Sequence, residues 1–321
     1  MLQTVHCGNV ATLQRLVAAP EVRSVAFTGS LAGGLAVQQA AAAKIIPVGL
    51  ELGGNDPAYV RADVDVAWAA AEIVDGAVFN SGQSCCAIER VYVHADIYDA
   101  FLAEVVKVLE GYRLGDPFDP ATQVGPVVSP AAAAAIAAHV RDAVDKGARV
   151  LTPDVFGAGT ARGVTFVRPE LLADCNHSMR VMVEETFGPV IAVARVASDE
   201  DAVKHMNDSD LGLTASVWTK DVATAERLVE RIDAGTVFVN RCDYPSPVCA
   251  PGGIFGGGWL TYGRISRGWD GRTVAGDRRW VDSGSMRLCA SRASTSRTIR
   301  NKGSCARRYA RWSAIYSLVC F

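Results

Sequence analysis

The chain has 321 residues, enough for two domains, and half of them are hydrophobic, so it can bury a sizeable core. Its formal net charge is only −2, but residues 245–321 carry 12 Arg and one Lys against three Asp and no Glu. No uncharged apolar run reaches the roughly 18 residues of a membrane span, and no basic segment followed by an apolar one opens the chain. We therefore expect neither a membrane protein nor a signal peptide.

The first predicted elements form a strand–turn–helix unit. Apolar residues at helical spacing between positions 10 and 17 indicate a short helix, and residues 22–27 alternate with the period of a strand. Residues 28–30 form a glycine-containing turn into an Ala-rich helix that extends to residue 44. Such a unit suits a phosphate above the turn, although an ordinary strand–helix connection has the same pattern. The next predicted strand, 46–51, ends at Glu51.

Two adjacent thiols lie on a predicted loop. An amphipathic helix over 65–79 leads into Asn80-Ser81-Gly82, which breaks it, because Asn and Gly accept left-handed backbone angles near a helix end. Cys85 and Cys86 follow, and residues 90–94 resume as a strand. A loop on a rigid scaffold can hold such side chains and still expose them.

The rest of the chain up to residue 244 alternates strands and helices. We predict further strands at 58–60, 149–151, 165–167, 190–196, 214–218 and 236–239. We predict further helices at 98–109, 131–146, 199–206 and 221–232. This alternation with short links indicates the α/β fold class with mostly parallel sheets.

The nine cysteines are scattered along the chain at positions 7, 85, 86, 175, 242, 249, 289, 305 and 320. No Cys-x-x-Cys pair occurs, so we expect no structural zinc and no metal site. The adjacent Cys85 and Cys86 would be strained as a disulfide, and a reducing compartment fits best. We expect a soluble, cytoplasmic protein.

A thiol and a carboxylate stand out chemically. The sequence Leu-Glu-Leu-Gly-Gly at residues 50–54 sets Glu51 among apolar and glycine residues at a strand end. A cysteine that attacks and a carboxylate that takes up protons are the two parts of a covalent acyl-transfer site. The alternatives are that Cys85 is a buried small hydrophobe and that Glu51 is a salt-bridged or surface glutamate.

Five motifs, by their order along the chain and their spacing, resemble the aldehyde dehydrogenase superfamily. Gly-Gln-Ser-Cys at 82–85 places its cysteine 34 positions after Glu51. The other motifs are Phe-Thr-Gly-Ser at 27–30 with Gly34, Leu-Glu-Leu-Gly-Gly at 50–54, Glu-Glu-Thr-Phe-Gly-Pro at 184–189, and Asn207 with Gly212-Leu213. The resemblance covers roughly residues 8–244.

The resemblance implies an aldehyde dehydrogenase-like α/β fold in three parts. Residues 1–51 would be the remnant of a Rossmann-like NAD(P)-binding domain, residues 52–244 a catalytic thiol domain, and residues 245–321 a basic, disordered tail outside the family pattern. The implied activity is oxidation of a small-molecule aldehyde to a carboxylic acid with NAD or NADP.

The resemblance also assigns catalytic roles. Cys85 adds to the aldehyde to give a thiohemiacetal, which passes hydride to the nicotinamide and becomes a thioester that water hydrolyses. Glu51 is the general base for that water, because apolar neighbours raise the pKa of a carboxylate toward a useful range. The backbone N–H of Cys85 would form half of an oxyanion hole, and Cys86 is expected to be a packing residue.

Six residues contact the cofactor by resemblance: Gly29, Ser30, Gly34, Leu52, Glu185 and Phe187. Glu185 would hold the nicotinamide ribose through a charge-assisted hydrogen bond, and Phe187 would pack beside the ring. The neighbouring Glu184 has no such role in the family.

The chain departs from the family pattern at both ends. It begins partway through the family's cofactor domain, so the family's asparagine oxyanion donor and its lysine at the adenine ribose have no counterpart here. After residue 244 the glycine-rich substrate-loop segment and the closing strand are not recognisable. The elements by which the family forms homo-oligomers are expected to be missing as well.

These departures leave alternatives to an active dehydrogenase. One is a catalytically impaired remnant that acts as a non-enzymatic or interaction protein. Another is a cysteine hydrolase that pairs Cys85 with a histidine, although no histidine lies in a recognisable signature. The five candidates are His6, His94, His139, His177 and His205. The basic tail indicates either nucleic-acid binding or a stretch not selected for folding, and we expect no specific nucleic-acid partner and no membrane partner.

Overall fold

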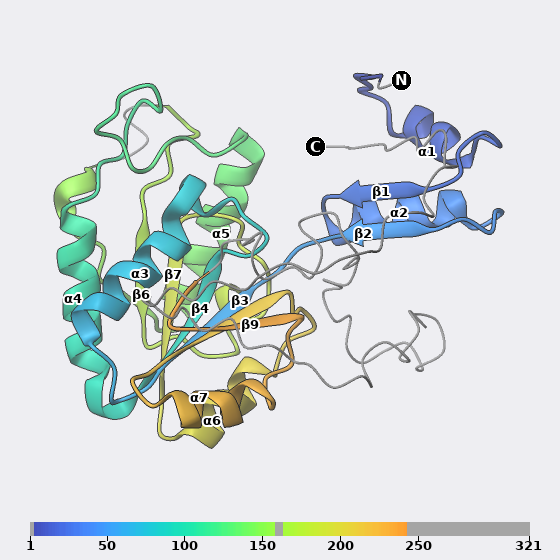
Figure 1. The fold of residues 1–321 in the computed structure, drawn as a ribbon. Helices are drawn as coiled ribbons and strands as arrows, with labels where there is room; N and C mark the ends of the chain where they lie inside the picture. Colours follow the sequence, from blue (N-terminus) through green and yellow to red (C-terminus); the bar gives the residue numbers. More distant parts are fainter. Residues whose placement is uncertain (1–2, 158–162, 243–321) are drawn as a thin grey trace, which may run out of the picture. The chain divides into compact units, whose positions relative to one another are not determined.

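The computed structural model describes residues 3–157 and 163–242, so the expectations for the 245–321 tail lie outside the described residues. The chain divides into two compact units, with the boundary after Leu52. The N-terminal unit contains the glycine turn, and the larger unit, which begins at Gly53, contains the thiol loop (Figure 1).

The N-terminal unit pairs two parallel strands through an intervening helix. Its elements are α1 (Val10–Ala18), β1 (Val25–Thr28), α2 (Leu31–Ala41) and β2 (Val48–Glu51). Thr28 lies opposite Glu51 at the carboxyl ends of the two strands. The Lys44 ammonium donates hydrogen bonds of 2.7 Å to the carbonyls of Val17 and Ala19, where the negative end of the α1 dipole favours a cation.

The larger unit is built on one seven-stranded sheet. In spatial order its strands are β5 (Arg149–Val150), β6 (Glu170–Ala173), β7 (Val190–Val196), β4 (Ile88–His94), β3 (Asp56–Val60), β8 (Thr214–Trp218) and β9 (Thr236–Val239). Only the β5–β6 pair is antiparallel among these strands. The predicted mostly parallel α/β sheet is confirmed.

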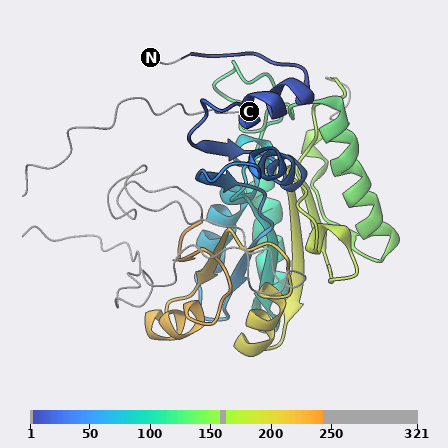
Figure 2. The ribbon, with the colours of Figure 1, turned by 90° about the vertical axis from the view of Figure 1, so that its right-hand side faces the viewer.

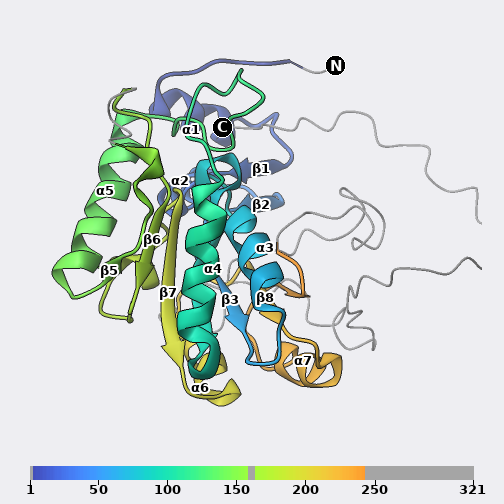
Figure 3. The same ribbon diagram turned by 90° about the vertical axis from the view of Figure 1, so that its left-hand side faces the viewer.

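Helices cover both faces of this sheet. The α-helices of the larger unit are α3 (Val66–Val78), α4 (Tyr98–Glu110), α5 (Pro130–Asp145), α6 (Asp199–Met206) and α7 (Val222–Val229). Short 3-10 turns are η1 (Phe79–Gly82), η2 (Ala95–Ile97), η3 (Asp154–Phe156) and η5 (Arg180–Met182). α3 and α4 lie side by side on one face (Figure 3), and their buried residues share one core cluster. α5, α6 and α7 pack into a second cluster on the other face.

Different segments of the chain lie at the two ends of the parallel sheet. β7 and β8 lead at their carboxyl ends into α6 and α7, which lie at the same end of the unit (Figure 2). The Gly53-Gly54 pair, the thiol loop and the 184–189 loop precede β3, β4 and β7, so they lie at the amino ends of three neighbouring strands. This end is the one that carries the candidate site.

One predicted strand is wrong. Residues 165–167 form no strand, because the N–H of Phe166 donates to the carbonyl of Gly163 at 3.1 Å and the N–H of Val167 to that of Thr165 at 3.2 Å. These donors are used in local turns and are not left for a ladder. The strand of this region is β6, which begins after Pro169 and whose Glu-Leu-Leu-Ala sequence lacks the β-branched alternation of a typical strand. None of the helices among residues 3–157 and 163–242 is long and apolar enough to cross a membrane.

Candidate active site

The thiol loop begins with a left-handed turn. Asn80, Ser81 and Gly82 have φ angles of 51°, 58° and 70°, which confirms that this motif ends helix α3. Ser81 is the unexpected member, because serine seldom adopts this conformation. Its hydroxyl donates a 2.9 Å hydrogen bond to the carbonyl of Gly125, which holds the turn against a neighbouring loop.

Gln83 fixes the same loop from its other side. Its side-chain amide N–H donates to the carbonyl of Asn80 at 3.0 Å, and its amide oxygen accepts from the N–H of Val128 at 2.7 Å. The Gln of the Gly-Gln-Ser-Cys motif therefore has a structural role, since it ties the thiol loop to residues 126–128.

Cys85 and Cys86 are both partly exposed thiols. Their sulfur atoms lie 3.7 Å apart, beyond disulfide bonding and within reach of a weak S–H···S contact. The predicted position of Cys85 on an accessible loop between a helix and a strand is confirmed.

Two glycines allow three segments to approach one another closely. A Cβ atom on Gly54 would lie 2.1 Å from the backbone carbonyl oxygen of Cys85. A Cβ atom on Gly53 would lie 2.1 Å from the carboxylate of Glu185. Neither position can carry a side chain without a shift of the backbone or of the Glu185 carboxylate. The Gly-Gly pair therefore leaves the space that the thiol loop and the Glu185 carboxylate occupy.

Glu185 and Phe187 lie beside this glycine pair. The Glu185 carboxylate accepts a 2.9 Å hydrogen bond from the N–H of Gly54, and burial raises its pKa above the ordinary value of a glutamate. Phe187 has a left-handed φ of 50° and a side chain that is 40% exposed. Glu184 instead forms a surface ion pair with Arg180 at 2.8 Å.

Sequence reasoning missed a group of buried polar residues beneath the site. Glu89 accepts hydrogen bonds from the N–H groups of Thr186 and Phe187. Arg90 is fully buried and donates from Nε to the carbonyl of Asn55 at 2.8 Å. The available signal was a pair of adjacent charged residues at the start of an otherwise apolar strand.

Asp56 completes this group. Its carboxyl group is buried and accepts hydrogen bonds from the N–H and the hydroxyl of Thr214. Burial raises the pKa of Asp56 well above its ordinary value, against the effect of the Thr214 donors. The Asn55 side-chain amide is buried, and neither its nitrogen nor its oxygen has a hydrogen-bond partner within the described part of the chain.

The N-terminal unit holds the other predicted cofactor residues. Ser30 caps α2, and its hydroxyl accepts from the N–H of Gly33 at 3.2 Å. A Cβ atom on Gly29 would lie 2.7 Å from the ring of Phe27, and one on Gly34 would lie 2.7 Å from the side chain of Leu52. The turn is thus packed too closely for side chains at these glycines.

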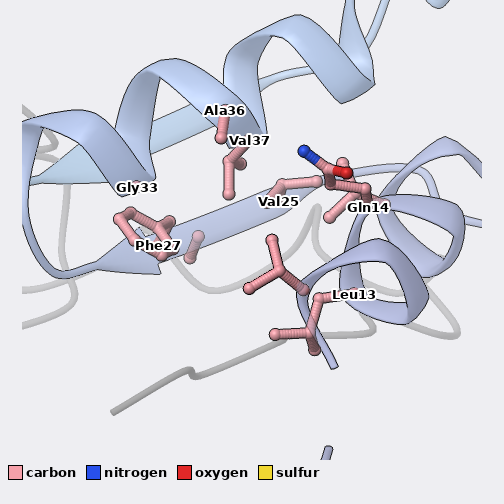
Figure 4. A pocket seen from close by; sticks show the side chains of 10 residues that line it. Leu13, Gln14, Val25, Phe27, Gly33, Ala36 and Val37 are labelled. Atoms are coloured by element: carbon pink, nitrogen blue, oxygen red, sulfur yellow. The ribbon is translucent and has the colours of Figure 1, made fainter. Parts of the chain in front are cut away.

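An apolar pocket of about 160 Å³ lies between α1, β1 and α2. Figure 4 shows Leu13 of α1, Val25 and Phe27 of β1, and Val37 of α2 around it. The pocket and the glycine turn belong to the same unit, since Phe27 and Gly33 line the pocket and also flank the turn.

Glu51 is the last residue of β2 in the N-terminal unit, whereas Cys85 belongs to the larger unit. The Glu51 backbone carbonyl accepts from the N–H of Gly29 at 3.0 Å. Glu51 therefore lies beside the glycine turn, and its role as the base remains a prediction.

The histidine rings of the larger unit have other partners. His139 contacts the Thr186 hydroxyl at 3.1 Å, and His177 contacts the Tyr92 hydroxyl and the Asp208 carboxylate, each at 2.8 Å. The cysteine-hydrolase alternative gains no support from these contacts. Among residues 3–157 and 163–242, no three side chains of His, Cys, Asp or Glu are grouped to hold a metal ion.

Comparison with known proteins gives a single family. Residues 1–259 match the aldehyde dehydrogenase family. The chain is 42% identical over 216 residues to 4,4'-diapolycopene aldehyde oxidase of Methylomonas sp., covering 67% of this chain and 39% of that protein. It is 37% identical over 256 residues to the NADP-dependent succinate-semialdehyde dehydrogenase of Mycolicibacterium paratuberculosis, covering 79% and 52%.

Solved structures agree with this result. The NADP-dependent glyceraldehyde-3-phosphate dehydrogenase of Bacillus halodurans, solved with NADP, has a TM-score of 0.70 and 36% identity over 75% of this chain and 49% of its own. The lactaldehyde dehydrogenase of Escherichia coli has a TM-score of 0.69 and 36% identity over 78% and 51%. The chain spans about half the length of most of these proteins. On its sequence match and its fold, the chain belongs to the aldehyde dehydrogenase family.

Proposed function

We propose that this chain oxidises a small-molecule aldehyde to the carboxylic acid with NAD or NADP. The observation that carries the proposal is the meeting of the Cys85 loop, the Gly53-Gly54 pair and Glu185 at one end of the parallel sheet. A partly exposed thiol lies there on an anchored loop, which is the requirement for covalent catalysis.

The chemistry assigned to this chain's residues begins at Cys85. Its thiolate adds to the aldehyde carbon, and the thiohemiacetal that forms loses hydride to become a thioester. Water attacks the thioester, the carbon–sulfur bond breaks, and the acid leaves while the thiol is restored. We assign Glu51 as the base that takes the proton from that water, and the Cys85 N–H as one donor to the developing oxyanion.

The N-terminal unit fits a dinucleotide. The turn from Gly29 to Gly34 and the Ser30-capped start of α2 suit a phosphate, because a helix start presents backbone N–H groups and positive dipole charge. The adjoining apolar pocket suits the flat face of a nucleotide base. Leu52, the residue after β2, packs its side chain against Gly34. When bound, NAD or NADP supplies the hydride acceptor.

The larger unit offers groups for the nicotinamide half. The Glu185 carboxylate is half-buried and accepts a hydrogen bond from the Gly54 N–H. Its exposed side is suited to accept further hydrogen bonds from ribose hydroxyls. The Phe187 ring is exposed enough to pack beside a planar group. We accordingly assign residues 1–51 to cofactor binding and residues 52–244 to the catalytic thiol domain.

The test is reduction of NAD or NADP by the full chain in the presence of an aldehyde. Relatives named for succinate semialdehyde and lactaldehyde make these two compounds the first substrates to try. We expect Cys85→Ser to abolish aldehyde-dependent cofactor reduction and Cys86→Ser to retain it. A folded full chain that reduces neither cofactor would favour the catalytically impaired alternative, and equal activity of Cys85→Ser and the parent would refute the thiol assignment.

A further inference from the structure

Glu89 is a buried carboxylate directly beneath the 184–189 loop. It is the second residue of β4 and is 2% exposed. Its two oxygens accept one hydrogen bond each, at 2.8 Å from the N–H of Thr186 and at 2.7 Å from the N–H of Phe187. A carboxylate removed from water is tolerated where such donors replace its hydration.

These two hydrogen bonds hold a strained segment. Phe187 has a φ of 50°, a left-handed conformation that is unfavourable for an aromatic residue and persists only where its surroundings fix it. Thr186 is fixed a second time, because its hydroxyl contacts Nδ1 of His139 at 3.1 Å. On the other side, a Cβ atom on Gly82 would lie 2.2 Å from the carbonyl oxygen of Gly188, so the thiol loop packs directly against this segment.

We propose that Glu89 is a positioning residue for cofactor binding, which holds the backbone of Thr186 and Phe187 so that Glu185 and the Phe187 ring keep their orientation. Glu185 immediately precedes the clamped pair and reaches Gly54 at 2.9 Å, so a change in the loop backbone would move its carboxylate. The inference rests on the proposed function, because Glu89 acts here only through Glu185 and Phe187.

The charges around Glu89 make the clamp depend on pH. Burial raises the pKa of Glu89 to about 8, and the nearby Glu185 carboxylate acts in the same direction. The two backbone donors and the Arg90 guanidinium act in the opposite direction. The ionised carboxylate can accept both N–H groups, whereas the protonated form turns one oxygen into a hydroxyl. The clamp therefore tightens as pH rises through about 8.

The first test is amide hydrogen exchange in the full chain. We expect the protection of the Thr186 and Phe187 amides to rise between about pH 7 and pH 9 in the parent protein. In Glu89→Gln this rise should disappear and protection should fall about tenfold. The matched control is Glu104→Gln, which removes a carboxylate that pairs with Lys107 on α4, outside this loop. A Glu89→Gln profile equal to the parent's would overturn the inference.

A second variant guards against misfolding. Glu89→Asp keeps the charge on a shorter side chain that cannot reach both N–H groups, so one of the two amides should lose protection and the pH step should remain. A flat profile in the parent would show that Glu89 keeps one protonation state over this range and would overturn the pH dependence, whereas the loss of protection in Glu89→Gln decides the clamp itself.

The second test is cofactor binding, measured by calorimetry with NAD and with NADP. We expect Glu89→Gln to weaken binding about tenfold, and its loss to be less than additive with that of Glu185→Gln in the double variant, because part of the effect of Glu89 passes through Glu185. Additive losses would overturn the positioning role. A full chain that binds neither cofactor would contradict the proposed function, whereas the exchange profile would still decide whether Glu89 holds the loop.

Discussion

The Glu185 carboxylate accepts a 2.9 Å hydrogen bond from the N–H of Gly54, a residue 131 positions earlier in the chain. The same Gly54 has no room for a Cβ atom, because the carbonyl oxygen of Cys85 occupies that position. The backbone of Gly54 thus helps to fix the positions of Glu185, the proposed ribose ligand, and of Cys85, the proposed nucleophile. Changes at Gly54 should therefore affect the thiol and the cofactor together.

Gly54→Ala should disable the site while the fold survives. Its methyl group would lie 2.1 Å from the Cys85 carbonyl oxygen, so the thiol loop has to move. Misplacement of a nucleophile by about 1 Å can cost roughly 10²-fold in rate, and we expect a loss of at least that size in aldehyde oxidation. The control is Gly111→Ala, whose Cβ would meet no atom closer than 3.4 Å. Equal activity of the two variants would show that the Gly54 contact is unimportant.

Thiol reactivity should single out Cys85. With a limiting electrophile, peptide mapping should find Cys85 labelled before its neighbour Cys86, because the Gly-Gln-Ser-Cys motif places Cys85 at the attacking position. Cys175 serves as the internal negative control, since burial raises its pKa to about 12 and suppresses the thiolate. Preferential labelling of Cys86 would reverse the assignment.

Arg90 should be one of the most important residues for stability. Its buried guanidinium donates to the carbonyl of Asn55 at 2.8 Å and to the Tyr92 hydroxyl at 3.2 Å. Arg90→Met removes these donors from a buried site and should lower the free energy of unfolding by about 3 kcal/mol, measured by urea denaturation. Arg149→Met, which removes an exposed ion pair with Asp174, should have a much smaller effect. Similar losses in both variants would contradict this account.

His177 should lose its contribution to stability in weakly acidic solution, against the opposite effect of the buried Glu89, whose raised pKa favours the folded chain as pH falls. Burial, followed by the charge of Arg90, lowers the pKa of His177 below its ordinary value of about 6.5. At this site the unfolded chain therefore takes up a proton first as pH falls, and the contribution of His177 to stability is lost below about pH 6.5. Burial lowers the pKa of His139 as well, so it contributes in the same direction.

The change in urea midpoint from about pH 7.5 to pH 5.5 is compared between the parent and His177→Gln, and the variant should be more stable relative to the parent at pH 5.5 than at pH 7.5. The same change in both proteins would mean that His177 titrates in the folded protein as it does in the unfolded chain.

Much of the fold follows from local sequence patterns. The strand at 190–196 and the helix at 199–206 have the predicted bounds, because a β-branched run and a Ser-capped acidic first turn mark them clearly. The strand predicted at 165–167 is wrong, since local turns around Gly163 use its backbone donors. β6 was missed because its pairing with β7 depends on a partner that no local pattern reveals.

The site was predictable only in part. The left-handed break at 80–82 follows from Asn80 and Gly82, and the motifs identify Cys85 and Glu185. Glu89 was missed because strand alternation does not tell which charged side chain points inward. Its partners are backbone N–H groups 97 and 98 positions away, and no side-chain pattern marks them.

The central claim is that Cys85 carries the acyl group during aldehyde oxidation. The most direct measurement mixes the full chain with NAD or NADP and succinate semialdehyde, quenches the reaction in acid, and maps the thiol peptide by fragment mass spectrometry. With the quench made during the first turnover, before water hydrolyses the thioester, we predict an acyl adduct on Cys85 that forms in step with an equal amount of reduced cofactor and is absent in Cys85→Ser. Reduced cofactor without an adduct at Cys85, or an adduct on Cys86 that survives in Cys85→Ser, would contradict the account.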